Sequence, residues 1–264
     1  MRRFLLVACL LSLAFSARAQ QIRYRILDQN PKVNNTFIHF QGSMDLNSVN
    51  GIGFNLGLQG YHIMDDDLPL TLRGRYQREL WSGGEGSDFD GQGDDPLREM
   101  EYGGSFRLLG GNTTTNRADL KVVLSETYYA YVPAGRINEM LGRLSLYHWG
   151  ARDMRTTGLA AGIAVRSRKH TRVELITDSD RSYGCYRMNI FYADLLTTTF
   201  GNRWPDPDSG EKAPELQSLG YRLGYQQYRG DGLSLIYELS FRPGAPNLQA
   251  FISLGLTYGW DFLW

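Results

Sequence analysis

The chain has 264 residues, of which 42% are hydrophobic, 12% are aromatic and two are cysteine. A length of this order fits one barrel-sized domain or at most two small ones. Basic and acidic residues number 28 each, so the chain lacks the basic excess typical of nucleic-acid-binding proteins. Two cysteines exclude a disulfide scaffold and a four-thiolate zinc site, and the aromatic content argues against disorder.

Residues 1–19 have the pattern of a secretory signal peptide. Two arginines begin it, residues 4–15 are mainly apolar, and small residues precede a cleavage site expected after Ala19. A lipoprotein signal ending at Cys9 is the alternative, but the apolar segment before that cysteine has only about five residues, where about seven are needed. Residues 20–34 show no alternation of apolar and polar side chains, and we expect a periplasmic lead-in there.

From residue 35 to residue 264, apolar and polar side chains alternate with a period of two, which is the pattern of β-strands. In the segment 51–62, Ile52, Phe54, Leu56 and Leu58 share one face, and Gly53, Asn55, Gly57 and Gln59 share the other. The pattern predicts twelve strands, at 35–46, 51–62, 68–80, 98–109, 118–129, 139–149, 157–167, 170–178, 184–196, 218–229, 233–242 and 248–262. Ten strands remain if the short pair at 157–178 is not a hairpin.

A soluble β-sandwich would also alternate, so other features must separate it from a membrane barrel. The predicted segments of about ten to thirteen residues match the ~9 to 11 residues that a tilted membrane-spanning strand needs. Aromatic residues gather near segment ends, at 128–131, 147–149 and 258–260, where their rings suit the headgroup region. These features favour an all-β fold, an antiparallel up-and-down transmembrane β-barrel with apolar residues facing lipid and polar residues facing a lumen.

The last predicted strand continues its apolar face to the final residue. Its aromatic members are Tyr258, Trp260, Phe262 and Trp264. This ending resembles the carboxy-terminal insertion signal of bacterial outer-membrane β-barrel proteins. The resemblance implies an outer-membrane location, contact with outer-membrane lipids, and insertion by the barrel assembly machinery.

The two longest connections between predicted strands are residues 81–97 and 197–217. With a periplasmic amino terminus, both fall outside the cell, where long loops are expected. These loops are therefore candidates for binding a partner protein or a small solute. The glycines of 230–232 suit a tight turn on the periplasmic side.

The polar faces of the predicted strands carry charges of both signs, with arginine in the majority. We expect a salt-bridged interior, with a narrow path that prefers anions as the alternative. The residues expected to line the lumen are Arg73, Arg75, Glu79, Glu99, Glu101, Arg107, Arg166, Arg187, Arg222 and Glu238, together with Lys121, Arg143, Arg172, Glu174 and Arg242.

One loop resembles a calcium-binding loop. Asp88, Asp90, Gln92 and Glu99 occupy its positions 1, 3, 5 and 12, and a glycine occupies position 6. Glutamine at position 5 and the absence of flanking helices depart from the pattern. A solvated acidic loop is the default interpretation, and no other cofactor is expected.

The four histidines, His39, His62, His148 and His170, are far apart in the sequence and no nucleophile motif accompanies them. A fainter resemblance, carried by Arg155-Thr156-Thr157-Gly158, Asp180-Arg181-Ser182-Tyr183 and Tyr221-Arg222-Leu223-Gly224, is to the polymorphic toxin type 23 proteins of Bacteroidota. We therefore expect a non-enzymatic outer-membrane barrel, either a narrow channel or an accessory barrel. An outer-membrane enzyme acting on lipid or cell-wall substrates and a surface toxin-like protein are the alternatives.

Overall fold

The computed structural model describes residues 23–48, 51–65, 69–83, 98–123, 129–151, 154–176, 182–203, 218–229, 233–243 and 250–263. These residues form the strands β1 (Tyr24–Asp28), β2 (Asn35–Ser48), β3 (Gly51–Met64), β4 (Leu70–Gly83), β5 (Arg98–Val123), β6 (Tyr129–Ala151), β7 (Met154–Leu175), β8 (Ser182–Arg203), β9 (Leu219–Arg229), β10 (Ser234–Phe241) and β11 (Ala250–Leu263). The described residues contain no helix that is long and apolar enough to cross a membrane.

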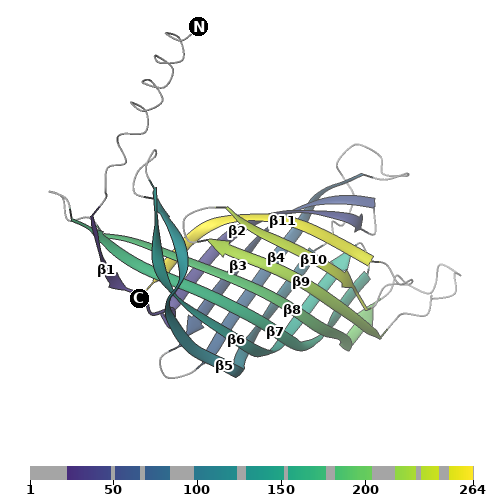
Figure 1. Ribbon diagram of the computed structural model, residues 1–264. Helices are drawn as coiled ribbons and strands as arrows, with labels where there is room; N and C mark the ends of the chain where they lie inside the picture. The colour runs from purple at the N-terminus through teal and green to yellow at the C-terminus, as the bar shows by residue number, and fades with distance from the viewer. Residues whose placement is uncertain are drawn as a thin grey trace, which may run out of the picture.

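Strands β2 to β11 close into an antiparallel barrel, which Figure 1 shows from the side. Each of these strands pairs with the next one in the chain, and β11 pairs with β2 from Ser253 opposite Asp45 to Leu263 opposite Asn35. This meander leaves no unpaired edge in the ring of ten strands that the structure describes. Closure of this kind satisfies the backbone hydrogen-bonding groups, which a bilayer requires.

The two faces of the barrel wall have opposite chemistry. On β2, Phe40 is 60% exposed on the outside, whereas its neighbour Gln41 is 1% exposed on the inside. The same contrast holds on β5 between Tyr102, 52% exposed, and Glu101, 4% exposed. A soluble protein buries its apolar side chains, so this inverted arrangement is that of a transmembrane β-barrel. The fold class predicted from the alternation is confirmed.

The ring has ten strands instead of twelve because two predicted breaks in the chain are not turns. β5 contains the segment 98–109 and most of 118–129, and β7 contains 157–167 and most of 170–178. Gly110 and Gly111, with φ of 86° and 97°, lie at shifts in the register between β5 and β6. Turn-forming residues here make bulges that bend one long strand.

Both chain ends of the ring lie at one end of the barrel, which we call the terminus end, because Asn35 pairs with Leu263 there. β4 ends and β5 begins at the opposite end, the loop end, and so do β8 and β9. The two long connections, 84–97 and 204–217, therefore join strands at the same end of the barrel. Both connections were expected on one side of the membrane, which this arrangement allows. The prediction divided β5 into two strands, which reversed the expected direction of the strands that follow. It also divided β7 into two, which reversed the direction again, so the strands from residue 184 onward have the expected direction.

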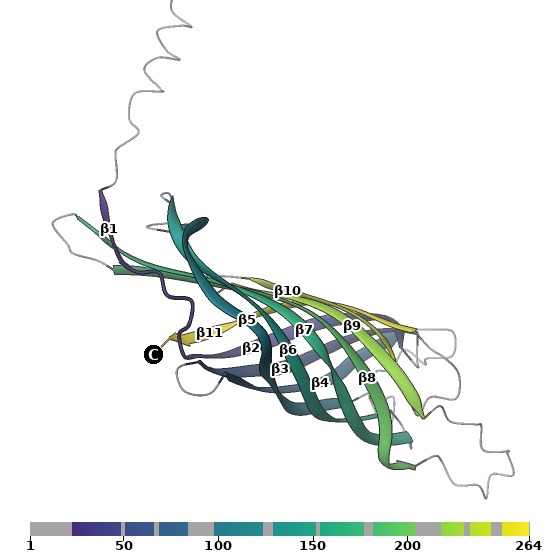
Figure 2. The same ribbon diagram turned by 60° about the horizontal axis from the view of Figure 1, so that its bottom comes forward.

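Beyond the ring, β5 to β8 extend past the terminus end and form a small two-layer structure (Figure 2). One layer is the arm, residues 118–123 and 129–134, and the other consists of β1 and the ends of β7 and β8. Its buried residues are Leu120, Val122, Val132, Ala134, Val173 and Cys185. The segment 20–34, which shows no alternation and was expected to be a lead-in, contains the strand β1, which pairs with β7.

β8 turns the opposite way from the prediction. Arg187 was expected to face the lumen, which would place its apolar neighbours toward lipid, but Tyr186, Met188, Ile190 and Tyr192 are at most 3% exposed and point inward. They pack with Phe37, Tyr61, Ile63, Leu141, Ala164 and Tyr228 in an apolar plug inside the barrel. Tyr147 and Trp149, expected at the headgroup level, are also buried inside. The lumen is therefore partly apolar.

Candidate functional site: the ion-paired interior

Two networks of charged side chains fill the part of the interior that the plug leaves. The Glu101 network consists of Arg73, Arg75, Glu99, Glu101, Arg143, Asp194, Arg222, Glu238 and Arg242. The Glu139 network consists of Asp65, Arg107, Glu139, Arg166 and Arg168. Inward-pointing positions of neighbouring strands supply both sets, because every second residue of a strand faces the lumen.

Glu101 and Asp194 share Arg222 at the centre of the first network. The Arg222 guanidinium donates to both oxygens of Glu101, at 2.7 and 2.8 Å, and to Asp194 Oδ2 at 2.7 Å. Asp194 also accepts two parallel bonds from Arg143, at 2.9 and 3.0 Å. Glu101 accepts further bonds from Arg73 and from the Ser145 hydroxyl. Each carboxylate thus has several donors, as charged groups in a low-dielectric interior require.

Tyr192 ties this centre to Glu238. Its hydroxyl donates to Glu238 Oε2 at 2.6 Å, and the Arg143 guanidinium lies 4.0 Å from the centre of its ring. The ring leans over Gly224, which is its partner on β9, and a Cβ at that position would overlap the ring. The glycine therefore makes room for an aromatic ring that orders the charges on both sides.

Glu238 and Glu99 hold Arg75 between them. Arg75 Nη1 lies 3.0 Å from Glu238 Oε2, and Arg75 Nη2 donates to Glu99. Glu99 also accepts from Gln77 Nε2 at 2.9 Å and lies 2.8 Å from Arg242 Nη2. These contacts carry the network from β4 across to β10.

In the Glu139 network, three arginines surround one carboxylate. The Nε atoms of Arg107, Arg166 and Arg168 donate to Glu139 at 2.6, 2.8 and 3.0 Å. Arg107 and Arg168 also donate to Asp65, which follows the end of β3. The network therefore bonds the β3–β4 connection to the wall formed by β5, β6 and β7.

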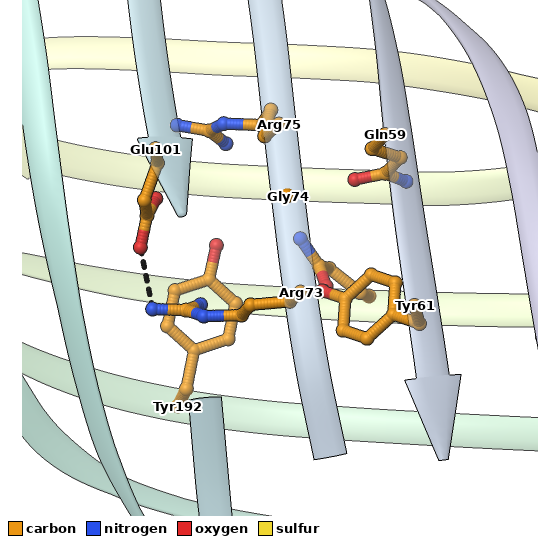
Figure 3. A pocket seen from close by; sticks show the side chains of 8 residues that line it. Gln59, Tyr61, Arg73, Gly74, Arg75, Glu101 and Tyr192 are labelled. Carbon is orange, nitrogen blue, oxygen red and sulfur yellow. Dashed lines mark hydrogen bonds and ion pairs between the residues drawn. The ribbon is translucent and has the colours of Figure 1, made fainter. Parts of the chain in front are cut away.

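These contacts leave little free space in the interior that the structure describes. A cavity of about 10 Å³ lies among Gln59, Tyr61, Arg73, Arg75, Glu101 and Tyr192, in the view of Figure 3. That volume holds about one water molecule. Glu101, Arg143 and Arg222 are only 3 to 5% exposed, although side chains that line an open channel would contact water. In the described part of the chain, these side chains therefore pack against one another instead of lining an open channel.

Nine of the ten principal residues predicted to line the lumen lie inside the barrel. The exception is Arg187, which lies on the outer face of β8 between the inward-pointing Tyr186 and Met188. Of the five further residues, Arg143 and Arg242 lie inside, whereas Lys121, Arg172 and Glu174 belong to the two-layer structure beyond the ring.

Four charged members of the networks were not among the predicted lumen residues, and they are Asp65, Glu139, Arg168 and Asp194. The position of Asp194 could have been predicted from the sequence, because it lies on the same face of β8 as Tyr186, Met188, Ile190 and Tyr192. A carboxylate at that depth costs more free energy in lipid than an arginine at the membrane edge. Asp65 and Arg168 fell in positions assigned to connections.

Three of the residues proposed for calcium, Asp88, Asp90 and Gln92, lie outside the described residues. Glu99 faces the interior and is bonded to Arg75, Gln77 and Arg242, so it is occupied in the Glu101 network. Within the described part of the chain, no group of three or more histidine, cysteine or acidic side chains could hold a metal ion.

The histidines occupy four separate places. The Nδ1 atoms of His62 and His148 lie 2.8 Å from the hydroxyls of Thr36 and Thr157, respectively. His39 packs inside against the rings of Phe37 and Tyr228, and His170 lies 3.6 Å from Asp28. Since these four imidazoles are not brought together, the structure offers no histidine cluster for catalysis.

The proposed insertion signal lies on β11. The backbones of Tyr258, Trp260 and Phe262 pair with Phe40, Ile38 and Thr36 of β2, so the last strand completes the ring. Trp264 lies outside the described residues. The function of these aromatic residues as a signal stays a prediction.

Comparisons with known proteins found no related family and only weak structural similarity. No protein-family model matches the sequence, and no curated protein matches it. The resemblance to polymorphic toxin type 23 proteins therefore stays a prediction.

Two solved structures are similar at a low level. The OmpF of Salmonella typhi in complex with daunomycin is 6% identical, with 90% of this chain and 100% of that chain covered and a TM-score of 0.26. A BenF-like porin from Pseudomonas fluorescens Pf-5 is 10% identical, with 88% and 98% covered and a TM-score of 0.18. Scores this low do not establish a shared fold, and the barrel is defined by its strand pairing and its burial pattern.

Proposed function

We propose that this protein is an outer-membrane β-barrel that conducts no solute through its resting lumen and serves as an accessory barrel for a partner. The observation that carries the proposal is the burial of the ion networks and the apolar plug inside the ring, where Glu101, Arg143 and Arg222 are only 3 to 5% exposed. A hydrated solute needs a continuous path through the barrel, and these side chains occupy it.

The outer-membrane location is part of the proposal. It is supported by the apolar exterior of the closed ring and by the signal peptide expected in residues 1–19. Heat-dependent migration on a detergent gel and fractionation with outer membranes test it. A protein found in the soluble periplasmic fraction would contradict it.

The accessory role is supported by the two-layer structure at the terminus end. The arm and the extension of β7 and β8 bury an apolar cluster of their own, outside the ring. A barrel with only a permeation role does not need such a structure. A partner protein would contact this structure or the long connections at the loop end, and the chemistry of that partner is left open.

Planar bilayer recordings of the purified protein test the closed lumen. We expect no stepwise conductance from the unaltered protein. A matched variant, Arg222→Ala with Arg143→Ala, removes two guanidinium groups from the centre of the Glu101 network and should produce conductance steps if it folds. Stable steps from the unaltered protein would contradict the proposal.

A second candidate function is a narrow path for anions, and one observation favours it. Eight arginines point into the barrel, Arg73, Arg75, Arg107, Arg143, Arg166, Arg168, Arg222 and Arg242, against seven carboxylates, Asp65, Glu79, Glu99, Glu101, Glu139, Asp194 and Glu238, in the described part of the interior. This candidate predicts spontaneous openings with an anion-selective reversal potential in a chloride gradient. The same recordings therefore separate the two functions.

A further inference from the structure

Four basic side chains form a row across the outer wall of the barrel near its terminus end. Arg136 of β6 lies opposite Lys169 of β7 in the strand register. Lys169 lies opposite Arg187 of β8, and Arg187 lies opposite Arg229 of β9. These strands are neighbours in the wall (Figure 1), and at about 4.8 Å per strand the row spans roughly 14 Å. We call it the cationic row.

The cationic row faces away from the lumen. The residues next to it along the strands, Arg168, Met188 and Tyr228, are at most 2% exposed and point inward. Because successive residues of a strand point to opposite faces, the row itself lies on the outer side. It is therefore separate from the ion networks of the interior.

Like charges placed directly opposite each other on neighbouring strands repel. The row contains three such pairs in succession. Arg136 donates to Asn138 and Ser167, and Arg229 donates to Gln227, all of which are neutral side chains. The Nε atom of Arg187 is buried and has no hydrogen-bond partner in this part of the chain. An anion that lies against such a row lowers the repulsion between its members, so the row suits an anionic ligand.

The depth of the row identifies where that anion lies. Two residues further along each strand toward the barrel centre, the next outward-pointing side chains are polar. Two residues beyond these, the outward-pointing side chains are apolar. The polar set is Asn138, Ser167, Asn189 and Gln227, and the apolar set is Met140, Val165, Phe191 and Tyr225. This order, from cation through amide and hydroxyl to hydrocarbon, matches the order of groups from the phosphate of a phospholipid to its acyl chains.

We infer that the cationic row binds the headgroup phosphates of anionic phospholipids in the leaflet at the terminus end. The inference rests on the proposed membrane-spanning barrel. The guanidinium groups match the geometry of phosphate oxygens, and the polar set lies next to the glycerol and ester region. The acyl chains then lie along the apolar set, which a free phosphate ion cannot contact.

The loop end offers a matched control. There, Arg78 of β4 lies opposite Arg98 of β5, and both are exposed on the outer face. The same register line continues through Gly150 of β6 to Arg155 of β7 and Arg203 of β8, so basic residues share one line at this end as well. Arg78→Gln therefore removes one external positive charge without touching the cationic row.

The test measures lipid binding to the full protein extracted from membranes into a neutral detergent. The probe is dioleoylphosphatidylglycerol, compared with dioleoylphosphatidylcholine, and bound lipid is counted by native mass spectrometry. We expect the unaltered protein to prefer phosphatidylglycerol several-fold. The triple variant Arg136→Gln, Arg187→Gln and Arg229→Gln should lose this preference, and Arg78→Gln should keep it. Each variant must first show the gel shift of a folded barrel.

The thermal unfolding midpoint gives a second readout, because the order of stability of the unaltered protein and the triple variant should differ between the two lipids. In phosphatidylcholine vesicles, the triple variant should melt at the same temperature as the unaltered protein or higher, because the repulsion is removed. In phosphatidylglycerol vesicles, the unaltered protein should melt higher than the triple variant. The same order of stability in both lipids would contradict the inference.

Other outcomes distinguish the remaining explanations. Equal binding of the two lipids by a protein that shifts normally on the gel overturns the inference and leaves the proposed barrel intact. Full displacement of phosphatidylglycerol by millimolar inorganic phosphate identifies a site for free anions and overturns the lipid assignment. Failure of the unaltered protein to shift or to enter vesicles overturns the proposed function itself.

Discussion

Glu101 shows how single residues hold the barrel interior together. It accepts hydrogen bonds from Arg73, Arg222 and Ser145 while only 4% exposed. Glu101→Gln removes the carboxylate that Arg73 and Arg222 share and leaves Arg222 with Asp194 alone. Breaking a buried ion pair costs about 3–5 kcal/mol. We expect the free energy of unfolding to fall by that amount, measured by urea titration of the folded band on a detergent gel.

Glu174→Gln is the control for Glu101→Gln, because it makes the same chemical change in an exposed pair. Arg25 and Glu174 are 66% and 23% exposed and lie 2.5 Å apart. Solvent screens such a pair, so its loss should cost less than about 1 kcal/mol. Equal effects of the two substitutions would show that the buried networks do not stabilise the barrel.

The contact between Tyr192 and Gly224 gives a second prediction. Gly224→Ala forces the Tyr192 ring away from β9 and weakens its 2.6 Å bond to Glu238. Overpacking of this kind costs about 1–3 kcal/mol in unfolding free energy. Gly74→Ala is the control, since a Cβ there meets no atom within 4 Å, and it should be neutral or slightly stabilising. A midpoint for Gly224→Ala equal to that of Gly74→Ala would disprove the packing role.

Individual residues also explain where the sequence was sufficient and where it was not. Most inward charges were predicted correctly because they alternate with large apolar residues, as Arg73 and Arg75 do with Leu72 and Tyr76. β8 has apolar residues on both faces, so hydrophobicity alone could not orient it. Its one decisive residue is Asp194, whose bonds to Arg143 and Arg222 fix the face. A shift of one residue in the assignment moves every side chain to the wrong side.

The strands themselves were predicted well where a short turn separates them and poorly where the chain bends within one strand. β2, β3, β9 and β10 fall close to their predicted ranges. In β5, Gly110 and Gly111 resemble a turn, but they lie at register shifts within one strand. Local sequence cannot separate a bulge from a turn, because both use glycine at positive φ and only the partner strand decides.

The arm of β5 and β6 should fold and dock as a unit separate from the ring. Val132 is 1% exposed in the cluster that joins the arm to β7 and β8. Val132→Asp places an unpaired carboxylate in that cluster, which costs several kcal/mol, so the arm should detach while the ring persists. Limited trypsin digestion should then cut after Lys121 while the gel shift of the barrel remains. Loss of the gel shift would show that the ring depends on the arm.

The complete barrel combines an outer face and inward charges that the sequence largely predicts with an apolar plug that it does not. The outward alternation is local, and it sufficed for the fold class. The apolar plug arises from residues such as Phe37, Tyr61 and Tyr228, which meet only after the ring closes. Closure of the lumen therefore follows from contacts between strands distant in the chain, which no single-strand pattern encodes.

The depth of lipid around the complete barrel leads to a final prediction. Ile163 and Leu219 are 50% and 58% exposed on the outer face, but Ile163 lies halfway along the outer face of β7 and Leu219 lies at the loop end of β9. Lysine at the bilayer midplane of a barrel costs about 2–4 kcal/mol, against about 0–1 kcal/mol near the interface. Ile163→Lys should therefore lower the unfolding free energy in vesicles far more than Leu219→Lys. In a water-soluble barrel both substitutions would be neutral or would improve solubility, so equal effects in vesicles would refute the membrane assignment.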